Sequence, residues 1–166
     1  MITCLLTAAM MMASGDTTGI NTAVEGQVLR FQLYITPPPE SLGAQGCFFY
    51  DELLKIEVDN MSKIKSIKLS DSAPDWLRQN LESSLKKFPK MSRGLDSIIT
   101  VNKVKNTKLL IPMQIKSETY PCPLATPFQP DPLLYTFSNK LLSGNFRFLN
   151  TVTFLYSVNY KFKAPE

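Results

Sequence analysis

Three hydrophobic periods follow one another between residues 53 and 115, and their order constrains the fold more than any other feature. Leu54, Ile56 and Val58 alternate with polar residues, a pattern typical of a half-buried strand. A second alternating stretch covers 64–69, a run with helical spacing covers 77–88, and a third alternating stretch covers 109–115. This order predicts a strand-strand-helix-strand core over 53–116 in an α+β fold: a small antiparallel sheet with one main amphipathic helix packed on one face.

Two irregularities mark the strands of this core. Ile64 and Ile67 are three residues apart where alternation requires two, so we expect a β-bulge between them. Pro112 lies inside the strand 108–116 and cannot donate a backbone hydrogen bond. We therefore expect this strand to have one unpaired side or a bulge.

The central helix has an apolar stripe and candidate ends. The stripe comprises Leu77, Leu81, Leu85 and Phe88. Pro74 lies at the expected first turn and Pro89 at the expected end. The N-cap candidates are Ser70, Asp71 and Ser72. Residues 90–106 fit either a short strand at 98–104 or a helical or irregular connection, and we favour the latter.

The residues before the core suggest a leader followed by a flexible stretch. Residues 1–15 are apolar and end in small residues, which resembles a signal peptide, although the charged start is missing. A disordered or core-packing N-terminus is the alternative. Residues 16–27 are polar and predict a flexible lead-in, whereas the alternation over 28–36 predicts a strand that ends at the prolines 37–39. A single domain is thus expected over 28–166.

The residues after the core change in composition. Five prolines within 117–132 predict an extended loop, and residues 133–142 fit a short helix. In the extension 133–166, aromatic and aliphatic residues alternate from Phe146 to Phe162, which predicts one long C-terminal strand with its apolar side chains on one face. Too few strands are expected for a self-contained outer-membrane barrel.

Three cysteines leave the redox state open. If residues 1–15 are removed, Cys4 goes with them and Cys47 and Cys122 remain, which an oxidising compartment would join as a disulfide. Two free buried thiols are the alternative.

The composition argues against several function classes. The net charge is +4, but acidic residues are interspersed among the lysines and arginines, so we expect no nucleic-acid binding. The chain has no histidine and no activated nucleophile, so we expect neither an enzyme nor a metal or cofactor site. No apolar run is long enough for a transmembrane segment.

The core resembles the TonB C-terminal domain family. The resemblance covers LLKIEVDNMSKIKSIKLSDSAPDWLRQNLESSLKKF and LLIPMQI, where the 64, 67, 69 spacing and the proline of the last strand match the family's strand-turn-strand-helix-strand unit. The chain is also similar to small exported proteins of Bacteroidota type. Ser62 stands where the turn glycine is usual. The sequence shows neither the membrane-spanning helix nor the linker of energy-transducing members, so no receptor-contacting residue is carried over. The resemblance implies a periplasmic or secreted protein that binds extended segments by strand addition.

These observations favour a non-catalytic periplasmic or secreted interaction module with a protein partner. The alternative is a structural subunit that associates with outer-membrane proteins through the aromatic C-terminal strand. Strand addition requires an edge with free backbone groups. The candidate edge residues are Leu109, Ile111, Pro112, Met113, Thr151, Thr153 and Ser157.

Overall fold

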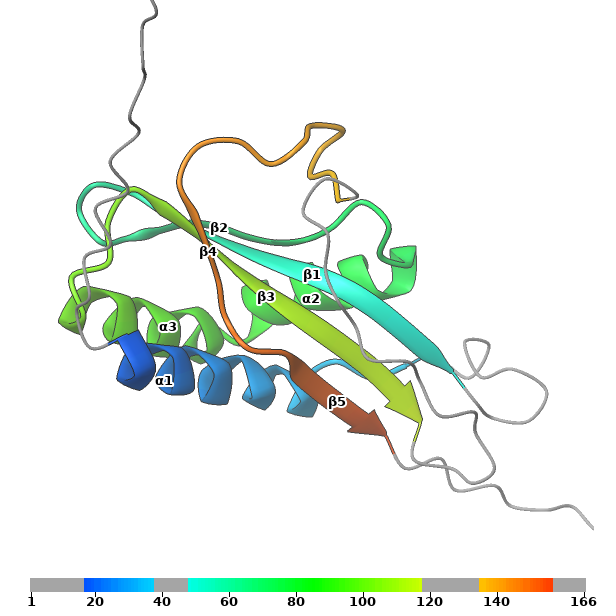
Figure 1. Ribbon diagram of the computed structural model, residues 1–166. Helices are drawn as coiled ribbons and strands as arrows, with labels where there is room; N and C mark the ends of the chain where they lie inside the picture. Colours follow the sequence, from blue (N-terminus) through cyan, green and yellow to red (C-terminus); the bar gives the residue numbers. More distant parts are fainter. Residues whose placement is uncertain (1–16, 38–47, 118–134, 157–166) are drawn as a thin grey trace, which may run out of the picture.

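The computed structural model describes residues 17–37, 48–117 and 135–156, and Figure 1 shows their arrangement. Within these residues five strands form one sheet in the order β2-β1-β3, with β4 and β5 both along the far side of β3. The strands are β1 Phe49–Val58, β2 Ile64–Leu69, β3 Thr107–Ser117, β4 Phe146–Phe148 and β5 Val152–Tyr156. The helices are α1 Thr17–Leu29, the 3-10 turn η1 Arg30–Leu33, α2 Asp75–Lys87 and α3 Lys90–Val101. The expected α+β class is confirmed.

The sheet is mixed rather than antiparallel throughout. β1 pairs antiparallel with β2 and β3, whereas β4 and β5 run parallel to β3. The predicted bulge is present: Val58 pairs with Ile64 and Glu57 with Ser66, so Lys65 is the extra residue. It allows Ile64, Ile67 and Leu69 to pack against the core on the helix side.

The central helix is confirmed as α2, but its predicted cap is wrong. Pro74 is the N-cap residue and no side chain caps the helix. The hydroxyls of Ser70 and Ser72 instead donate to Glu52, and Asp71 accepts from a distant turn. α2 ends before Pro89, and α3 confirms the helical interpretation of the connection.

Residues 17–36 depart most from the prediction. The expected lead-in over 16–27 is wrong where the structure describes it, because these residues form α1, and the strand expected over 28–36 is wrong as well. The apolar residues of this stretch fit both the helical spacing and the alternating spacing of a strand. The helical set, Ile20, Val24, Val28, Phe31 and Ile35, is buried. The alternating set includes Leu29 and Leu33, which are 46% and 79% exposed. The segment is helical because this conformation buries five apolar side chains against the sheet.

The prediction of one long C-terminal strand is also wrong in one respect, because residues 149–151 interrupt it. β4 and β5 each pair with β3, but Phe148 packs on one face of the sheet and Val152 and Phe154 pack on the other. An extra residue in a strand reverses the face of every following side chain, so the alternation seen in the sequence is not kept across the break. Residues 157–166 lie outside the described part of the chain.

The short helix expected over 133–142 is wrong for residues 135–142. Thr136 and Leu141 form an isolated antiparallel bridge, and Ser138 and Asn139 between them both have positive φ, 57° and 58°. Two consecutive left-handed residues are the signature of a type I′ turn, so this segment is a tight hairpin, called here the 135–142 hairpin.

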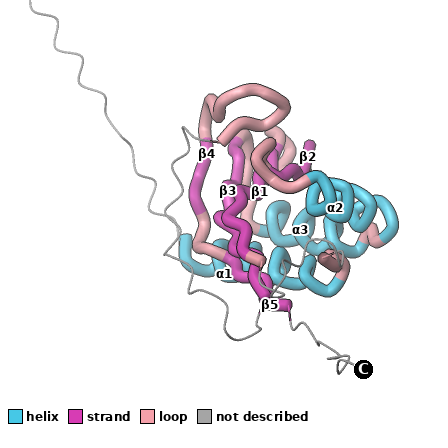
Figure 2. Tube along the Cα trace, turned by 90° about the vertical axis from the view of Figure 1, so that its right-hand side faces the viewer, coloured by secondary structure: helices cyan, strands magenta, loops and turns pink. Residues whose placement is uncertain are grey.

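The main core lies between the sheet and the helices. Figure 2 shows α2 and α3 to the right of the strands, on one side of the sheet, and α1 lies beside α3 and along β5. Trp76 of α2 packs edge-on against Tyr50 of β1 with ring centroids 5.9 Å apart. In the described residues, no helix has the length and apolar character needed to cross a bilayer.

Candidate functional site

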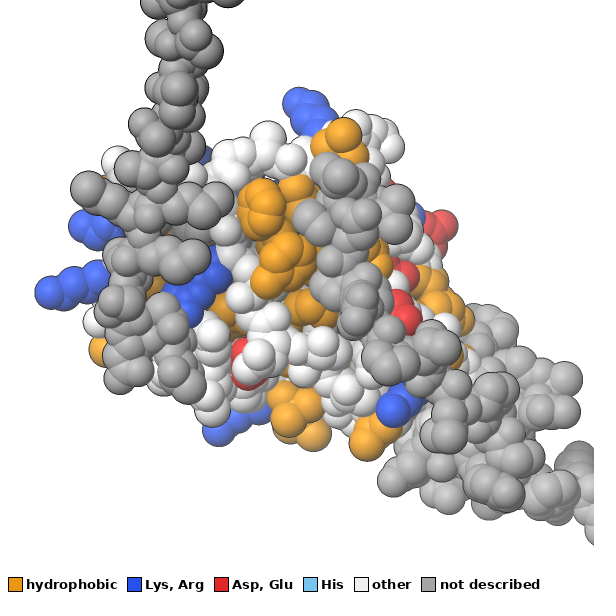
Figure 3. Space-filling model, viewed as in Figure 1, with side chains coloured by type: hydrophobic (Ala, Val, Ile, Leu, Met, Phe, Trp, Pro, Cys, Tyr) orange, Lys and Arg blue, Asp and Glu red, His pale blue; other side chains and the backbone are white. Residues whose placement is uncertain are grey.

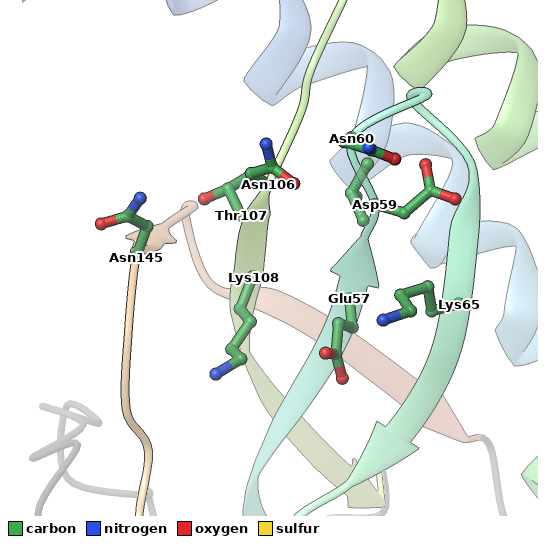
Figure 4. A pocket seen from close by; sticks show the side chains of 9 residues that line it. Glu57, Asp59, Asn60, Lys65, Asn106, Thr107, Lys108 and Asn145 are labelled. Carbon is green, nitrogen blue, oxygen red and sulfur yellow. The ribbon is translucent and has the colours of Figure 1, made fainter.

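A polar hollow of about 440 Å³ opens at one end of the sheet, where the β1–β2 turn meets the start of β3. Figure 4 shows the Glu57 carboxylate between the amines of Lys65 and Lys108. Asp59 also lines the hollow, but its Oδ1 accepts from the backbone N–H groups of Met61 and Lys63 and thereby closes the turn. The lining contains no histidine or cysteine, and the hollow is open to water. Its lining of carboxylates, amines and amides is suited to contact with polar groups.

A buried carboxylate lies at the other end of β1. Glu52 is 4% exposed, and its Oε2 accepts from the hydroxyls of Ser70 (2.8 Å) and Ser72 (3.0 Å). Burial raises the pKa of the Glu52 carboxyl above its ordinary value, and the two serine hydroxyls partly offset this. Ser70 is fully buried and also accepts from the N–H of Leu53 (3.3 Å). No substrate reaches this serine, so the cluster fixes the β2–α2 connection.

The 135–142 hairpin lies against the sheet face opposite the helices. Asp71 holds it, because its carboxylate accepts from the N–H groups of Ser138 (2.9 Å) and Asn139 (2.8 Å). Those bonds lower the pKa of the Asp71 carboxyl, with that to Asn139 as the main cause. The side chain of Phe137, within the hairpin, is buried, and the Lys55 amine lies 4.5 Å from its ring centroid.

Apolar side chains gather on this second face of the sheet. Figure 3 shows hydrophobic side chains in the middle of this face. The cluster consists of Leu53, Leu110 and Phe137, with Tyr135, Leu142 and Phe148 against it. Leu53 and Leu110, at the centre of the cluster, are fully buried.

The predicted edge at β3 is wrong. Leu109, Ile111 and Met113 belong to a strand with β1 on one side and β4 and β5 on the other. The unpaired side expected of this strand is absent, because β3 is paired on both sides, but the pairing on one side is interrupted at Pro112. β4 pairs as far as Leu110 and β5 begins at Met113, so Pro112 lies beside the break between them and its missing donor disrupts no strand pairing.

Of the predicted edge residues, Thr153 lies in β5, whereas Thr151 lies in the break before it. β5 is the last strand on its side of the described sheet. The N–H of Ser117 donates to Phe48 (3.1 Å), on the β1 side, so the next residue back, Lys116, directs its peptide groups towards β5. Lys116 pairs with Leu155, which therefore directs its own groups outward, and Thr153 shares that direction two residues earlier. Ser157, Cys47 and Cys122 lie outside the described residues.

The α1–η1 segment runs along this edge and contacts it with polar side chains. The Glu25 carboxylate accepts from the N–H of Asn150 (2.8 Å), and the side-chain amide of Gln32 donates to the carbonyl of Leu155. Leu29 and Leu33, beside these residues, are exposed. This part of the edge was not predicted. The signal was the helical spacing from Ile20 to Phe31, which competes with the strand period.

The opposite edge of the sheet, β2, is blocked in three ways. The bulge at Lys65 distorts it, and the N–H of Ile64 donates to Asp96 of α3 (3.1 Å). Lys63, Lys65 and Lys68 are exposed along it. Lysines and bulges are the usual devices that protect an edge strand from further pairing.

Neither models of known protein families, nor curated proteins, nor solved structures match this chain. The resemblance to the TonB C-terminal domain family therefore stays a prediction.

Proposed function

We propose that this protein is a non-catalytic interaction module that binds an extended protein segment as an additional strand on the outer edge of β5. The supporting observation is that the backbone groups of Thr153 and Leu155 face away from the sheet, with no further strand beyond them in the described residues. Backbone pairing at such an edge supplies affinity, and pockets for alternate side chains supply specificity.

The side chains of this edge favour pairing. Thr151, Thr153 and Leu155 carry no charge, and the strand consists of β-branched, aromatic and leucine residues. The contrast with β2, where three lysines and a bulge oppose pairing, supports β5 as the binding edge.

The alternative of an aromatic surface against outer-membrane proteins finds less support. Phe154 is fully buried in the chain's own core and Phe148 is half-buried, whereas Phe146 is 42% exposed. Within the described residues, most of the aromatic side chains on which that hypothesis depends are thus engaged inside the fold.

Strand addition is tested with peptides selected from a displayed ten-residue library for binding to the purified chain. A Thr153→Pro variant removes one outward N–H, and we expect at least about a tenfold loss of peptide affinity. The matched control is Thr153→Val, which keeps the N–H and should bind normally. N-methylation of alternate peptide residues should also abolish binding. Equal binding by Thr153→Pro, shown to be folded by the fluorescence of Trp76, would overturn the proposal.

A further inference from the structure

The exposed apolar residues of the α1–η1 segment lie on the β5 side of the molecule. Glu25 and Gln32 contact Asn150 and Leu155, so α1 and β5 run alongside each other. Figure 1 shows both along the same lower margin of the molecule, and Figure 3 shows hydrophobic side chains gathered there. Leu29 lies one helical turn after Glu25, and its side chain projects from the same side of the helix.

The positions of these residues along the edge correspond. Thr153 lies between Asn150 and Leu155 on β5, and Leu29 lies between Glu25 and Gln32 on α1–η1. Leu29 therefore lies near the level of Thr153, with Leu33 one turn further on. A strand added beyond β5 extends the sheet above these leucines. The molecule that supplies this strand therefore has to cover the leucines as well as bind the backbone groups of β5.

We infer that the occupant is β5 of a second copy of this chain, related by a twofold axis that passes beside Thr153 at right angles to the sheet. The inference rests on the proposed function, since it uses the same edge and names the partner. The two copies form one continuous sheet, in which the two β5 strands pair antiparallel and exchange backbone hydrogen bonds.

The register of this pairing follows from the outward-facing residues. A twofold axis at Thr153 places Thr153 opposite its own mate and Thr151 opposite Leu155 of the second copy. Thr153 and Leu155 direct their backbone groups outward, so the central Thr153 pair is of the hydrogen-bonded kind. Threonine opposite threonine is a favourable cross-strand pair.

The same axis brings the exposed leucines together. An axis at right angles to the sheet keeps the helices of both copies on one side, so the two α1–η1 segments meet beneath the junction and Leu29 and Leu33 of each copy are buried against those of the other. One self-complementary patch thus accounts for both the open edge and the exposed leucines, as an isologous dimer requires.

The charge distribution also favours self-association at this edge over β2. Residues 151–156 carry no charged side chain, so two β5 strands meet without like-charge repulsion between them. The chain has a net charge of +4, and two β2 edges would place six exposed lysines together.

Sedimentation velocity of the full chain from about 1 to about 100 µM tests the inference. We expect a reversible dimer, with dissociation constants raised at least about tenfold in Leu33→Glu and in Thr153→Pro. The control is Val101→Glu, which changes an equally exposed apolar residue, 75% exposed at the end of α3, and should leave the dimer unchanged.

Cross-linking supplies a readout that does not depend on the proline variant folding. In a chain whose three native cysteines are replaced by serine, Thr153→Cys should oxidise to a covalent dimer, because paired residues lie about 5.5 Å apart between Cα atoms. Asn60→Cys, in the exposed β1–β2 turn, should stay monomeric.

The outcomes separate the two proposals. A chain that is monomeric throughout, forms no Thr153→Cys dimer and yet binds selected peptides at β5 overturns the second-copy inference and leaves the proposed function standing. A monomer whose Thr153 amide is already protected from exchange, with no peptide bound, means that the chain covers its own edge and overturns both. A dimer that persists unchanged in Leu33→Glu and fails to cross-link at position 153 overturns this interface.

Discussion

The side-chain amide of Gln32 donates to the carbonyl oxygen of Leu155, so a residue of η1 occupies the place that a backbone N–H of a neighbouring strand would take. The edge of β5 is therefore partly satisfied in the free molecule. A partner strand has to displace this amide before it can complete its own pairing with β5.

Replacing Gln32 by alanine should strengthen strand association. The variant leaves the Leu155 carbonyl free, and a neutral hydrogen bond contributes about 1 kcal/mol, so we expect the dissociation constants for peptide and for dimer to fall about three- to tenfold. Fluorescence titration and sedimentation measure the two constants. Gln79→Ala, at an exposed position of α2, is the matched control. Weaker association in Gln32→Ala would show that this amide belongs to the binding surface and does not compete with the partner.

Adjacent substitutions in α1 separate the helical packing from the strand expected there. Val28 is fully buried and Leu29 is 46% exposed, so Val28→Ala should lower the free energy of unfolding by about 2 kcal/mol and Leu29→Ala by less than about 0.5 kcal/mol. Urea unfolding of dilute, monomeric samples measures both. The strand interpretation requires the opposite ranking, with Leu29 the more costly residue to truncate.

Val28 and Leu29 also belong to a segment whose structure could not be predicted from the sequence. The core over 53–116 was predictable because each of its segments satisfies only one period, and the stripe of Leu77, Leu81 and Leu85 fits no strand. Residues 20–35 satisfy two periods, and only the presence of the rest of the core decides which side chains are buried. Tertiary burial overrides local pattern in such a segment.

The C-terminal edge was predictable only in part, because the sequence pattern is local. The alternation around Thr153 identified a strand, and Pro112 identified an interruption in pairing, but the sequence does not show that the two features belong together. The break between β4 and β5 falls beside Pro112. Because that relation joins segments about forty residues apart, no local period contains it.

Replacing Ser62 in the β1–β2 turn by glycine should stabilise the protein. Its φ is +60°, a conformation that costs a residue with a side chain about 1 kcal/mol, so Ser62→Gly should raise the free energy of unfolding by up to about that amount. Chemical unfolding measures the change. The control is Ser66→Gly in β2, where glycine should destabilise by a similar amount. A loss of stability in Ser62→Gly would mean that the buried serine side chain contributes more than the backbone strain costs.

Asp71 should control the local stability of the 135–142 hairpin. Asparagine has one acceptor oxygen instead of two, so Asp71→Asn should weaken the bonds to the N–H groups of Ser138 and Asn139 and raise their hydrogen-exchange rates several-fold. Amide exchange followed by NMR measures this. Asp75→Asn, at an exposed carboxylate that bonds Arg78 instead of the hairpin, is the control. Unchanged exchange at both amides would contradict the assigned role of Asp71.

Glu52 should make stability fall as the pH rises above its ordinary titration range. Burial raises the pKa of this carboxyl in the folded protein above its ordinary value of 4.5, so the folded state binds a proton that the unfolded state has released. Its contribution is fully present below pH 4.5 and is lost as the pH rises through the folded pKa. Glu52→Gln keeps an oxygen that accepts from Ser70 and Ser72 but does not titrate. The stability of the wild type relative to this variant should therefore decrease with rising pH across that window, measured by urea unfolding at each pH. A constant difference would show that the carboxyl titrates alike in both states.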